Sequence, residues 1–389
     1  MAKRAGYSYN PQYPSVQDLA RKSKQRMPGF AHEYLIGGAN DEHNLSQNQL
    51  DFKEVELMPR YITEYGGANL QTELFGTTYS APFGVAPIGL QGLMWPNSPR
   101  ILAKAAAQHA IPFVLSTVST NSIEEIGQVT KGNFWFQLYH PAEDALRDDL
   151  LERAWQAGCR VLVVLADTPS FGFRYRDIRN GLAMPPTMSL RNVAQMLRRP
   201  GWSWRSLRHG QPQFASLVKY MPKGLDLKAL AQFMNQTFDG RLTPTKLRAL
   251  RKAWPGKLVV KGVVNPQDAA AALQAGAEGI IVSNHGGRQL DAGQSTIAAL
   301  PPLVAEYGHQ LEIMLDGGLR SGPDIARALA SGAKMVFLGR PFMWSVAALS
   351  SKGGSHLYEL LHAQLKQVME QLGCEDVRQL PEYLIHSKP

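Results

Sequence analysis

The sequence predicts an α/β fold, a (β/α)8 TIM barrel. Eight short apolar runs recur along the chain, and a stretch with helical spacing of its apolar residues follows each run. The runs are continuously apolar rather than alternating, as in parallel strands that are buried on both faces. A doubly wound sheet is the alternative, but no G-x-G-x-x-G follows the first run, and eight successive units favour the closed barrel.

Glycine or polar residues bound each predicted strand, and helical patterns lie between the strands, for example at 98–110, 142–158 and 321–333. We therefore expect residues 1–389 to form a single domain. The strands are predicted at residues 82–87, 112–116, 134–139, 160–168, 257–262, 278–284, 312–318 and 334–340.

Two additions interrupt this regular pattern. Residues 1–80 precede the first strand and contain helical signals at 15–26 and 29–38, so they are predicted to form a helical extension. Residues 169–242 separate the fourth strand from the next predicted helix. A connection of this kind normally has ~2–6 residues. The insertion is therefore a lid, a binding element or disordered.

Composition narrows the class of protein. With 44% hydrophobic residues the chain can bury a large core. It has only two cysteines, Cys159 and Cys374, which permit neither a disulfide framework nor zinc-ligand spacing, so we expect no metal and a reducing compartment. No run approaches the ~18 apolar residues that span a bilayer. The N-terminus lacks the apolar segment of a secretory signal, so we expect none.

Polar and ionisable residues collect at the carboxyl ends of the predicted strands, whereas the strand bodies are apolar. Active sites of TIM barrels form at that end. The sequence therefore predicts an active site built from Pro87, Ser116, Gln137, Tyr139, Asp167, Lys261, Ser283, His285, Asp316, Gly339 and Arg340.

The last two strand ends predict a phosphate site. Gly317 and Gly318 follow the seventh strand and Gly339 follows the eighth, with Arg320 and Arg340 beside them. Glycines let backbone N–H groups approach an anion closely, and this is the usual phosphate position of the fold. The alternative is ordinary turn glycines with surface arginines.

A phosphate site together with Lys261 suggests a phosphorylated cofactor across the barrel mouth. Flavin mononucleotide (FMN) suits this position, because a cation near the flavin ring stabilises its anionic reduced form. Ser116 and Gln137 can hydrogen-bond the polar edge of the ring. Lys261 could instead form a Schiff base, as in aldolases, but that would leave His285 and the nearby arginines without a role.

Several motifs resemble those of the FMN-dependent 2-hydroxy acid oxidases and dehydrogenases, a family that includes glycolate oxidase, L-lactate dehydrogenase and mandelate dehydrogenase. The motif "SNHGGRQLD" (283–291) is similar to the family signature. The resemblance covers nearly the whole chain and includes "HEYLIGGAND" (32–41), "FQLY" (136–139), "DTPSFGFRYRD" (167–177), "LDGGLRSG" (315–322) and "GRPF" (339–342).

The resemblance implies roles for individual residues. His285 would be the base that takes a proton from the substrate, and Asp167 would hold its imidazole and stabilise the imidazolium. Arg174 and Arg288 would bind the substrate carboxylate, for which planar guanidinium groups are well suited. By composition Arg176 is as good a candidate as Arg174, and only the motif register favours Arg174.

Tyr34 and Tyr139 would offer hydroxyls to the substrate, although both could simply pack in the core. The chain departs from the oxidases at Ile88 and Gly89, where Gly89 matches the dehydrogenases better, and at Leu165, where glycolate oxidase has threonine. These departures concern substrate size and electron acceptor. The resemblance places FMN against Pro87, Ile88, Gly89, Ser116, Gln137, Lys261, Ser283, Asp316, Gly317, Gly318, Arg320, Gly339 and Arg340.

The insertion carries most of the net charge. The segment 176–223 has nine basic residues and one acid, which gives +8 of the chain's +9. Its arginines are interleaved with Trp202 and Trp204, a pattern typical of an anionic membrane surface. A solvated lid is the alternative, and nucleic acid is the least favoured partner. The family's membrane-bound dehydrogenases carry an insertion here and pass electrons to quinone, which favours the membrane.

We therefore predict FMN-dependent oxidation of an L-2-hydroxy acid, lactate- or mandelate-like, to the 2-oxo acid. The stretch "GLQGLMWP" (89–96) resembles mandelate dehydrogenase and favours a bulky substrate. Quinone is the expected acceptor, at the cytoplasmic side of the inner membrane. If the insertion is only a lid, a cytoplasmic oxidase that reduces O2 to H2O2 is the alternative. An FMN-binding barrel with an isomerase or binding role is more remote. No cytochrome domain is expected, and the resemblance implies a homotetramer.

Overall fold

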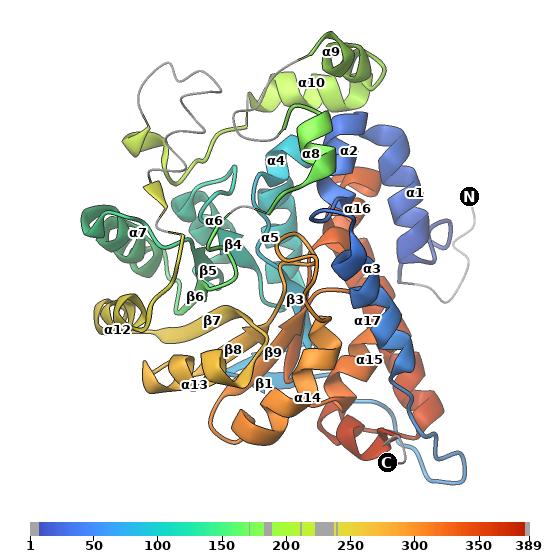
Figure 1. The fold of residues 1–389 in the computed structure, drawn as a ribbon. Coiled ribbons are helices and arrows are strands. Elements are labelled where there is room, and N and C mark those ends of the chain that lie inside the picture. Colours follow the sequence, from blue (N-terminus) through green and yellow to red (C-terminus); the bar gives the residue numbers. More distant parts are fainter. Residues whose placement is uncertain are drawn as a thin grey trace.

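The computed structural model describes residues 8–170, 172–182, 189–210, 212–221, 237–238 and 240–385. Eight parallel strands form one sheet in the order β3-β10-β9-β8-β7-β6-β5-β4. A parallel bridge between Val85 and Phe113 joins the two outermost strands, so the sheet closes on itself (Figure 1). The predicted (β/α)8 barrel is confirmed.

Each strand overlaps the run that predicted it. Alternate side chains, such as Val163 and Ile281, fill a small apolar cluster inside the barrel, and the others face the surrounding helices. This two-sided burial explains why the runs are continuously apolar. The strands are β3 Phe83–Val85, β4 Val114–Ser116, β5 Trp135–Leu138, β6 Val161–Leu165, β7 Lys257–Val263, β8 Gly279–Val282, β9 Glu312–Asp316 and β10 Met335–Leu338.

A hairpin closes the amino-terminal end of the barrel. Its strands are β1 (Thr72–Leu74) and β2 (Thr77–Tyr79). The Tyr79 hydroxyl accepts a hydrogen bond of 3.1 Å from Trp135 Nε1, and Phe75 packs against the same indole. With this end filled, the opposite end is left for a site.

Helices surround the sheet and begin at predictable caps. Side-chain oxygens of Ser122, Thr243, Asn265, Ser295 and Ser321 each accept a hydrogen bond from the backbone N–H three residues later, which satisfies a donor of the first turn. The helices are α4 Gln91–Met94, α5 Ser98–Gln108, α6 Ile123–Thr130, α7 Asp144–Gln156, α12 Pro244–Ala253, α13 Pro266–Gln274, α14 Thr296–Tyr307, α15 Gly322–Ala330, α16 Arg340–Leu349 and α17 Gly353–Leu372.

The amino-terminal extension lies along the barrel and reaches its carboxyl end. It forms α1 (Val16–Arg26) and α2 (Gly29–Ile36), close to the two predicted helical signals, and α3 (His43–Leu50), which no predicted signal covers. In Figure 1 α1 lies beside α16, and α2 lies near the top beside α8. The extension therefore contributes to the end of the barrel where the site is predicted.

The described part of the insertion forms α8 (Tyr175–Arg179), α9 (Leu190–Leu197) and α10 (Pro200–His209), and the last two stand above the barrel in Figure 1. One expectation for this segment is wrong. Trp202 is buried, packs edge-to-face on Phe30 and donates a 3.1 Å hydrogen bond to the Met94 carbonyl, so it is not a surface anchor. Lys223 lies outside the described residues.

Candidate active site

A cavity of ≈ 670 Å³ opens at the carboxyl ends of the strands. Two predicted residues, Asp167 and Ser283, lie behind its wall and contact residues that line it. The other predicted site residues all line it: Tyr34, Pro87, Ile88, Gly89, Ser116, Gln137, Tyr139, Arg174, Lys261, His285, Arg288, Asp316, Gly317, Gly318, Arg320, Gly339 and Arg340.

The loop after β8 presents His285 to this cavity. Three successive residues are left-handed: His285 has φ 58°, Gly286 65° and Gly287 75°. A Cβ on Gly287 would lie 2.6 Å from the Cα of Leu45 on α3, so only glycine allows this close approach. The motif "HGGR" therefore serves two purposes: Gly287 lets α3 pack against the loop, and the left-handed histidine lines the cavity.

His285 and Asp167 form a hydrogen-bonded pair. His285 Nδ1 lies 3.0 Å from Asp167 Oδ1. Burial alone would raise the pKa of Asp167, but at the acidic pH where this carboxyl titrates, the charges of protonated His285 and of Lys261 outweigh burial and lower it to about 2. Because the ionised carboxylate can only accept, Nδ1 carries the proton and Nε2 keeps its lone pair. Burial also lowers the pKa of His285, although Asp167 opposes this. The imidazole is thus neutral and able to accept a proton at neutral pH.

Lys261 is a buried cation held by two carboxylates. Its Nζ donates a 2.8 Å hydrogen bond to Ser283 Oγ and lies 3.3 Å from Asp316 Oδ2 and 3.8 Å from Asp167 Oδ2. Burial would lower its pKa, but Asp316 and Asp167 outweigh burial and raise it. A lysine that forms a Schiff base needs a lowered pKa. The arrangement therefore disfavours the aldolase alternative.

The predicted phosphate corner lies at the ends of β9 and β10. Gly318 has φ 84°, and a Cβ there would lie 2.0 Å from the Asn48 carbonyl oxygen, so the packing of α3 by itself requires glycine. The Arg320 guanidinium lies 5.2 Å from the Trp344 ring centre, and burial lowers its pKa to about 10. Arg320 is therefore still cationic at neutral pH, which suits an anion.

Arg340 makes contacts that the sequence did not reveal. Its guanidinium donates to the carbonyls of Leu35 (3.0 Å), Gly37 (2.8 Å) and Gly286 (2.9 Å). It therefore joins the end of α2 to the loop that carries His285, while it also lines the cavity.

The cavity wall has polar atoms that suit a flavin. Within the described part of the chain, Gln137 Nε2 and Asp316 Oδ1 are buried without a hydrogen-bond partner. Such atoms cost ~1–3 kcal/mol each unless a ligand pairs with them. The Gln137 amide can donate to a flavin carbonyl, and Asp316 can accept from a ribityl hydroxyl. With Lys261 and the arginine corner, these residues fit FMN.

Two arginines meet at the side of the cavity that faces α2 and α8. Arg288 Nη1 donates to the carbonyls of Tyr34 (2.7 Å) and Gly37 (2.9 Å), and its guanidinium lies 4.9 Å from the Tyr34 ring centre. Arg174 Nε donates a 3.2 Å hydrogen bond to the Arg288 carbonyl. Partly buried Tyr139 lines the same cavity, and desolvation of its hydroxyl, followed by the charge of Asp167, raises the pKa of that hydroxyl.

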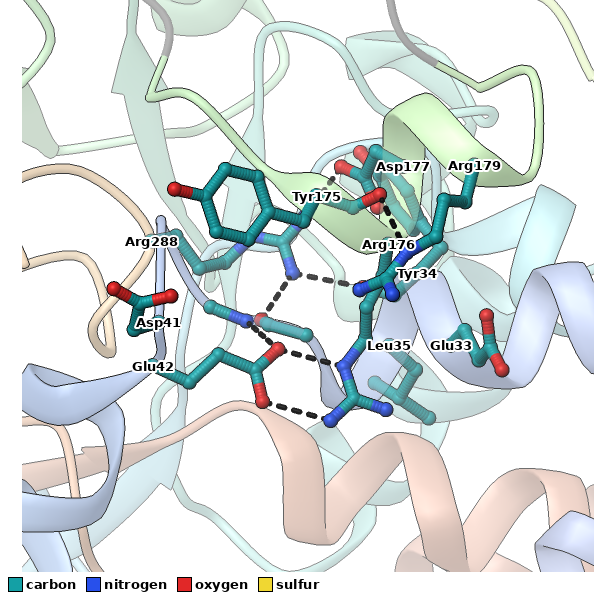
Figure 2. A network of polar contacts seen from close by, with 12 residues as sticks. Glu33, Tyr34, Leu35, Asp41, Glu42, Tyr175, Arg176, Asp177, Arg179 and Arg288 are labelled. Atoms are coloured by element: carbon teal, nitrogen blue, oxygen red, sulfur yellow. Dashed lines mark hydrogen bonds and ion pairs between the residues drawn. The ribbon is translucent and has the colours of Figure 1, made fainter.

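Arg176, the alternative to Arg174, has a different role. Its Nε and Nη2 make a bidentate pair with Glu42 at 2.6 and 2.7 Å, and it does not line the cavity (Figure 2). The motif register therefore selected the arginine that the structure places at the cavity.

Sequence reasoning missed two groups of lining residues. Asp177 lies three residues after Arg174, and its position on that motif was the only available signal. Burial raises the pKa of Asp177, whereas Arg288 and Arg174 oppose the rise. An apolar group from separate parts of the chain, Met94, Val118, Leu182 and Phe214, also lines the cavity.

A TIM barrel whose cavity combines a neutral histidine on an aspartate, a buried lysine and arginines at the last strand ends suits a phosphorylated redox cofactor. The model of the FMN-dependent dehydrogenase family matches residues 23–387. The chain therefore belongs to the FMN-dependent dehydrogenase family, and FMN is its cofactor.

The chain is 36% identical to an L-lactate dehydrogenase of Bartonella tribocorum over 367 residues, which are 94% of this chain and 96% of the relative. It is 36% identical to an (S)-mandelate dehydrogenase of Pseudomonas putida over 371 residues, 95% and 93% of the two chains. A crystal structure of the monotopic membrane protein (S)-mandelate dehydrogenase superposes with a TM-score of 0.90 at 35% identity, covering 96% of this chain and 100% of that one.

Proposed function

We propose that this protein oxidises an L-2-hydroxy acid, lactate- or mandelate-like, to the 2-oxo acid. The observation that carries the proposal is the presence of a neutral His285–Asp167 pair and of Arg174 and Arg288 around one cavity. A base and a carboxylate-binding pair are what oxidation of a hydroxy acid requires. The similarity to lactate and mandelate dehydrogenases supports the same reaction.

His285 Nε2 accepts a proton from the bound substrate. As the imidazole becomes cationic, the Asp167 carboxylate at 3.0 Å stabilises it and holds the ring in place. Arg174 and Arg288 bind the substrate carboxylate and so orient the hydroxyl-bearing carbon. Tyr34 and Tyr139 offer hydroxyls to the substrate.

The predicted cofactor residues would hold the flavin. Lys261 places a positive charge at the end of β7, Ser116 and Gln137 would hydrogen-bond the polar edge of the ring, and Arg320 with Arg340 would serve the phosphate. When bound, FMN would supply the oxidant and take up the two electrons, with the second of the two protons, that the hydroxy acid loses.

The apolar lining supports a bulky substrate. Met94, Val118, Leu182 and Phe214 add a hydrophobic surface to a cavity whose opposite parts are polar. A methyl group would leave much of such a surface without contact, whereas a phenyl ring would cover it. Between the two relatives, this favours a mandelate-like acid.

Anaerobic addition of L-lactate or L-mandelate to the purified protein is expected to bleach the visible absorption of the flavin, because electrons then pass from substrate to FMN without an acceptor. Stopped-flow rates for glycolate, L-lactate and L-mandelate should rise with the size of the side chain. If no 2-hydroxy acid bleaches the flavin, the oxidoreductase proposal fails. A strong preference for glycolate would contradict only the bulky substrate.

The exposed face of α9 and α10 supports peripheral membrane binding. Leu190, Leu197, Trp204 and Leu207 are 89%, 77%, 70% and 79% exposed, an unusual density of apolar side chains in solvent. Exposed cations Arg191 and Arg208 lie on the same two helices, and exposed Arg198 directly follows α9. Apolar residues beside arginines suit an anionic bilayer surface, where each cation contributes ~1 kcal/mol.

Not every cation of the segment 176–223 is free for this purpose. Arg176 is paired with Glu42, Arg199 donates to the Met27 carbonyl, and Lys219 is paired with Asp149. The charge available to a membrane is therefore smaller than the +8 of the sequence. In the described residues no helix is long and apolar enough to cross a membrane.

Replacing Leu197, Trp204 and Leu207 with serine is expected to abolish sedimentation with vesicles that contain anionic lipid, since the apolar contacts are lost. Flavin reduction by substrate should persist, because the described cavity lining includes none of these three residues. The matched control is Tyr61→Ser with Ile62→Ser, which removes two large apolar residues outside the insertion that are at least as exposed as Trp204. If the triple variant still binds vesicles, the exposed face of α9 and α10 is not the membrane-binding surface.

The proposed membrane binding also determines which electron acceptor we expect. A membrane-bound enzyme passes its electrons to quinone, and the triple variant should then lose quinone reduction while it still reduces a soluble dye. A soluble oxidase that produces H2O2 is the alternative. The homotetramer is a further part of the proposal, drawn from the family resemblance.

A further inference from the structure

A third charged side chain lies between the two arginines of the proposed carboxylate site. Asp177 Oδ2 is 3.6 Å from Arg174 Nη1 and 3.6 Å from Arg288 Nη2. Asp177 is 5% exposed and lines the cavity. Within the described residues its Oδ1 and the Nη2 of Arg288 have no hydrogen-bond partner.

These contacts differ from those of a structural ion pair. At 3.6 Å the Asp177 carboxylate is too far from either arginine for a good hydrogen bond. Glu42 and Arg176 in the same network, by contrast, form two parallel bonds of 2.6 and 2.7 Å (Figure 2). Asp177 therefore offsets positive charge at the site without using up the arginine N–H groups that a ligand needs.

The charges of this group define what it can accept. Two guanidinium groups and one carboxylate leave a net charge of +1 in a buried place. One substrate carboxylate makes the group neutral. A second carboxylate would leave an uncompensated negative charge where water is largely excluded, and such a charge is costly.

We propose that Asp177 is a specificity-determining residue that limits the site to 2-hydroxy monocarboxylates and rejects dicarboxylates. The inference rests on the proposed function, because it takes Arg174 and Arg288 as the carboxylate site. It adds a property that the arginines alone do not have, since two unopposed arginines would bind a dianion better than a monoanion.

The test uses two ligands that the enzyme cannot oxidise. Propionate and malonate differ by a methyl group in place of a carboxylate, and both lack a 2-hydroxyl. Their Kd values are measured at neutral pH on the FMN-loaded protein from changes in the flavin spectrum. The wild type should bind propionate more tightly. Asp177→Asn should shift the ratio of the two Kd values toward malonate by about tenfold or more, because a dianion gains twice as much as a monoanion from the removed charge.

Two further variants separate charge from structure. Asp177→Glu keeps the charge and should keep the preference for propionate. Glu42→Gln removes one negative charge from the same network, but Glu42 is paired with Arg176 rather than with Arg174 or Arg288, so it should change the ratio much less than Asp177→Asn does. Equal weakening of both ligands in Asp177→Asn would mean a purely structural role and overturn the proposal. A wild type that binds malonate as tightly as propionate would overturn it without any variant.

Failure of the proposed function gives a different result. In that case no 2-hydroxy acid reduces the flavin of the wild type. If the hydroxy acids reduce the flavin but the ratio of Kd values does not change in Asp177→Asn, only the inference about Asp177 is wrong.

Discussion

His285→Gln is expected to lower kcat by ~10²–10⁴ while FMN stays bound, because glutamine keeps the approximate size of the side chain but cannot act as a base. The Asp167 carboxylate would also lose its partner at 3.0 Å. Single-turnover flavin reduction under anaerobic conditions measures the effect on the chemical step, and the flavin absorption per protein measures cofactor retention. A variant with a near-normal rate would remove His285 from the role of base.

The pH profile provides an independent check on the same residue. Since burial lowers the pKa of His285, the wild-type rate should hold as pH falls from neutrality and decline only below the ordinary histidine range, ~6.5. Asp167, with its pKa of about 2, stays ionised throughout. The residual activity of His285→Gln should lack this decline at acidic pH.

Arg288→Lys is expected to lower kcat/KM by about 10- to 100-fold, mostly through KM. A charged hydrogen bond contributes ~1.5–3 kcal/mol, and lysine cannot reproduce the planar guanidinium that reaches the carbonyls of Tyr34 and Gly37 on one side and the cavity on the other. Steady-state kinetics with the best 2-hydroxy acid give the separate effects on kcat and KM.

Arg176→Lys is the matched control for this prediction. Arg176 belongs to the same motif as Arg174 but pairs with Glu42 rather than lining the cavity. Its kinetic constants should stay close to those of the wild type. An equal loss in both variants would mean that Arg288 acts by holding the fold and not by binding the substrate.

The strands could be predicted because each carries its own signal. A run such as 161–165, Val-Leu-Val-Val-Leu, is buried on both faces, and that environment leaves a continuous apolar pattern in the sequence. Strand ends then placed most of the cavity-lining residues, because the carboxyl ends of parallel strands meet by geometry. For His285 and Lys261, the position at a strand end was enough to predict that they lie in the site.

Other residues depend on contacts between distant segments. Trp202 and Trp204 look alike in the sequence, yet one is buried against Phe30 and the other is 70% exposed. Only the docking of α10 on α2 and α4 distinguishes them. In the same way Phe214 lines the cavity from within the insertion, where no predicted strand or motif indicated a site residue. The bonds from Arg340 to α2 could not be predicted from the sequence. All three partners of Arg340 are backbone carbonyls, which every type of residue has.

The bonds from Arg340 to the end of α2 bear on the order in which the chain can fold. The Leu35 carbonyl and the Arg340 guanidinium are separated by 305 positions, and the Arg288 bond to Tyr34 spans 254. During synthesis α2 emerges before the barrel, but its partners are among the last strand ends to leave the ribosome. The substrate end of the site therefore matures only when almost the whole barrel has been translated. Until then α2 lacks these bonds, so the complete substrate end of the site can form only late in synthesis.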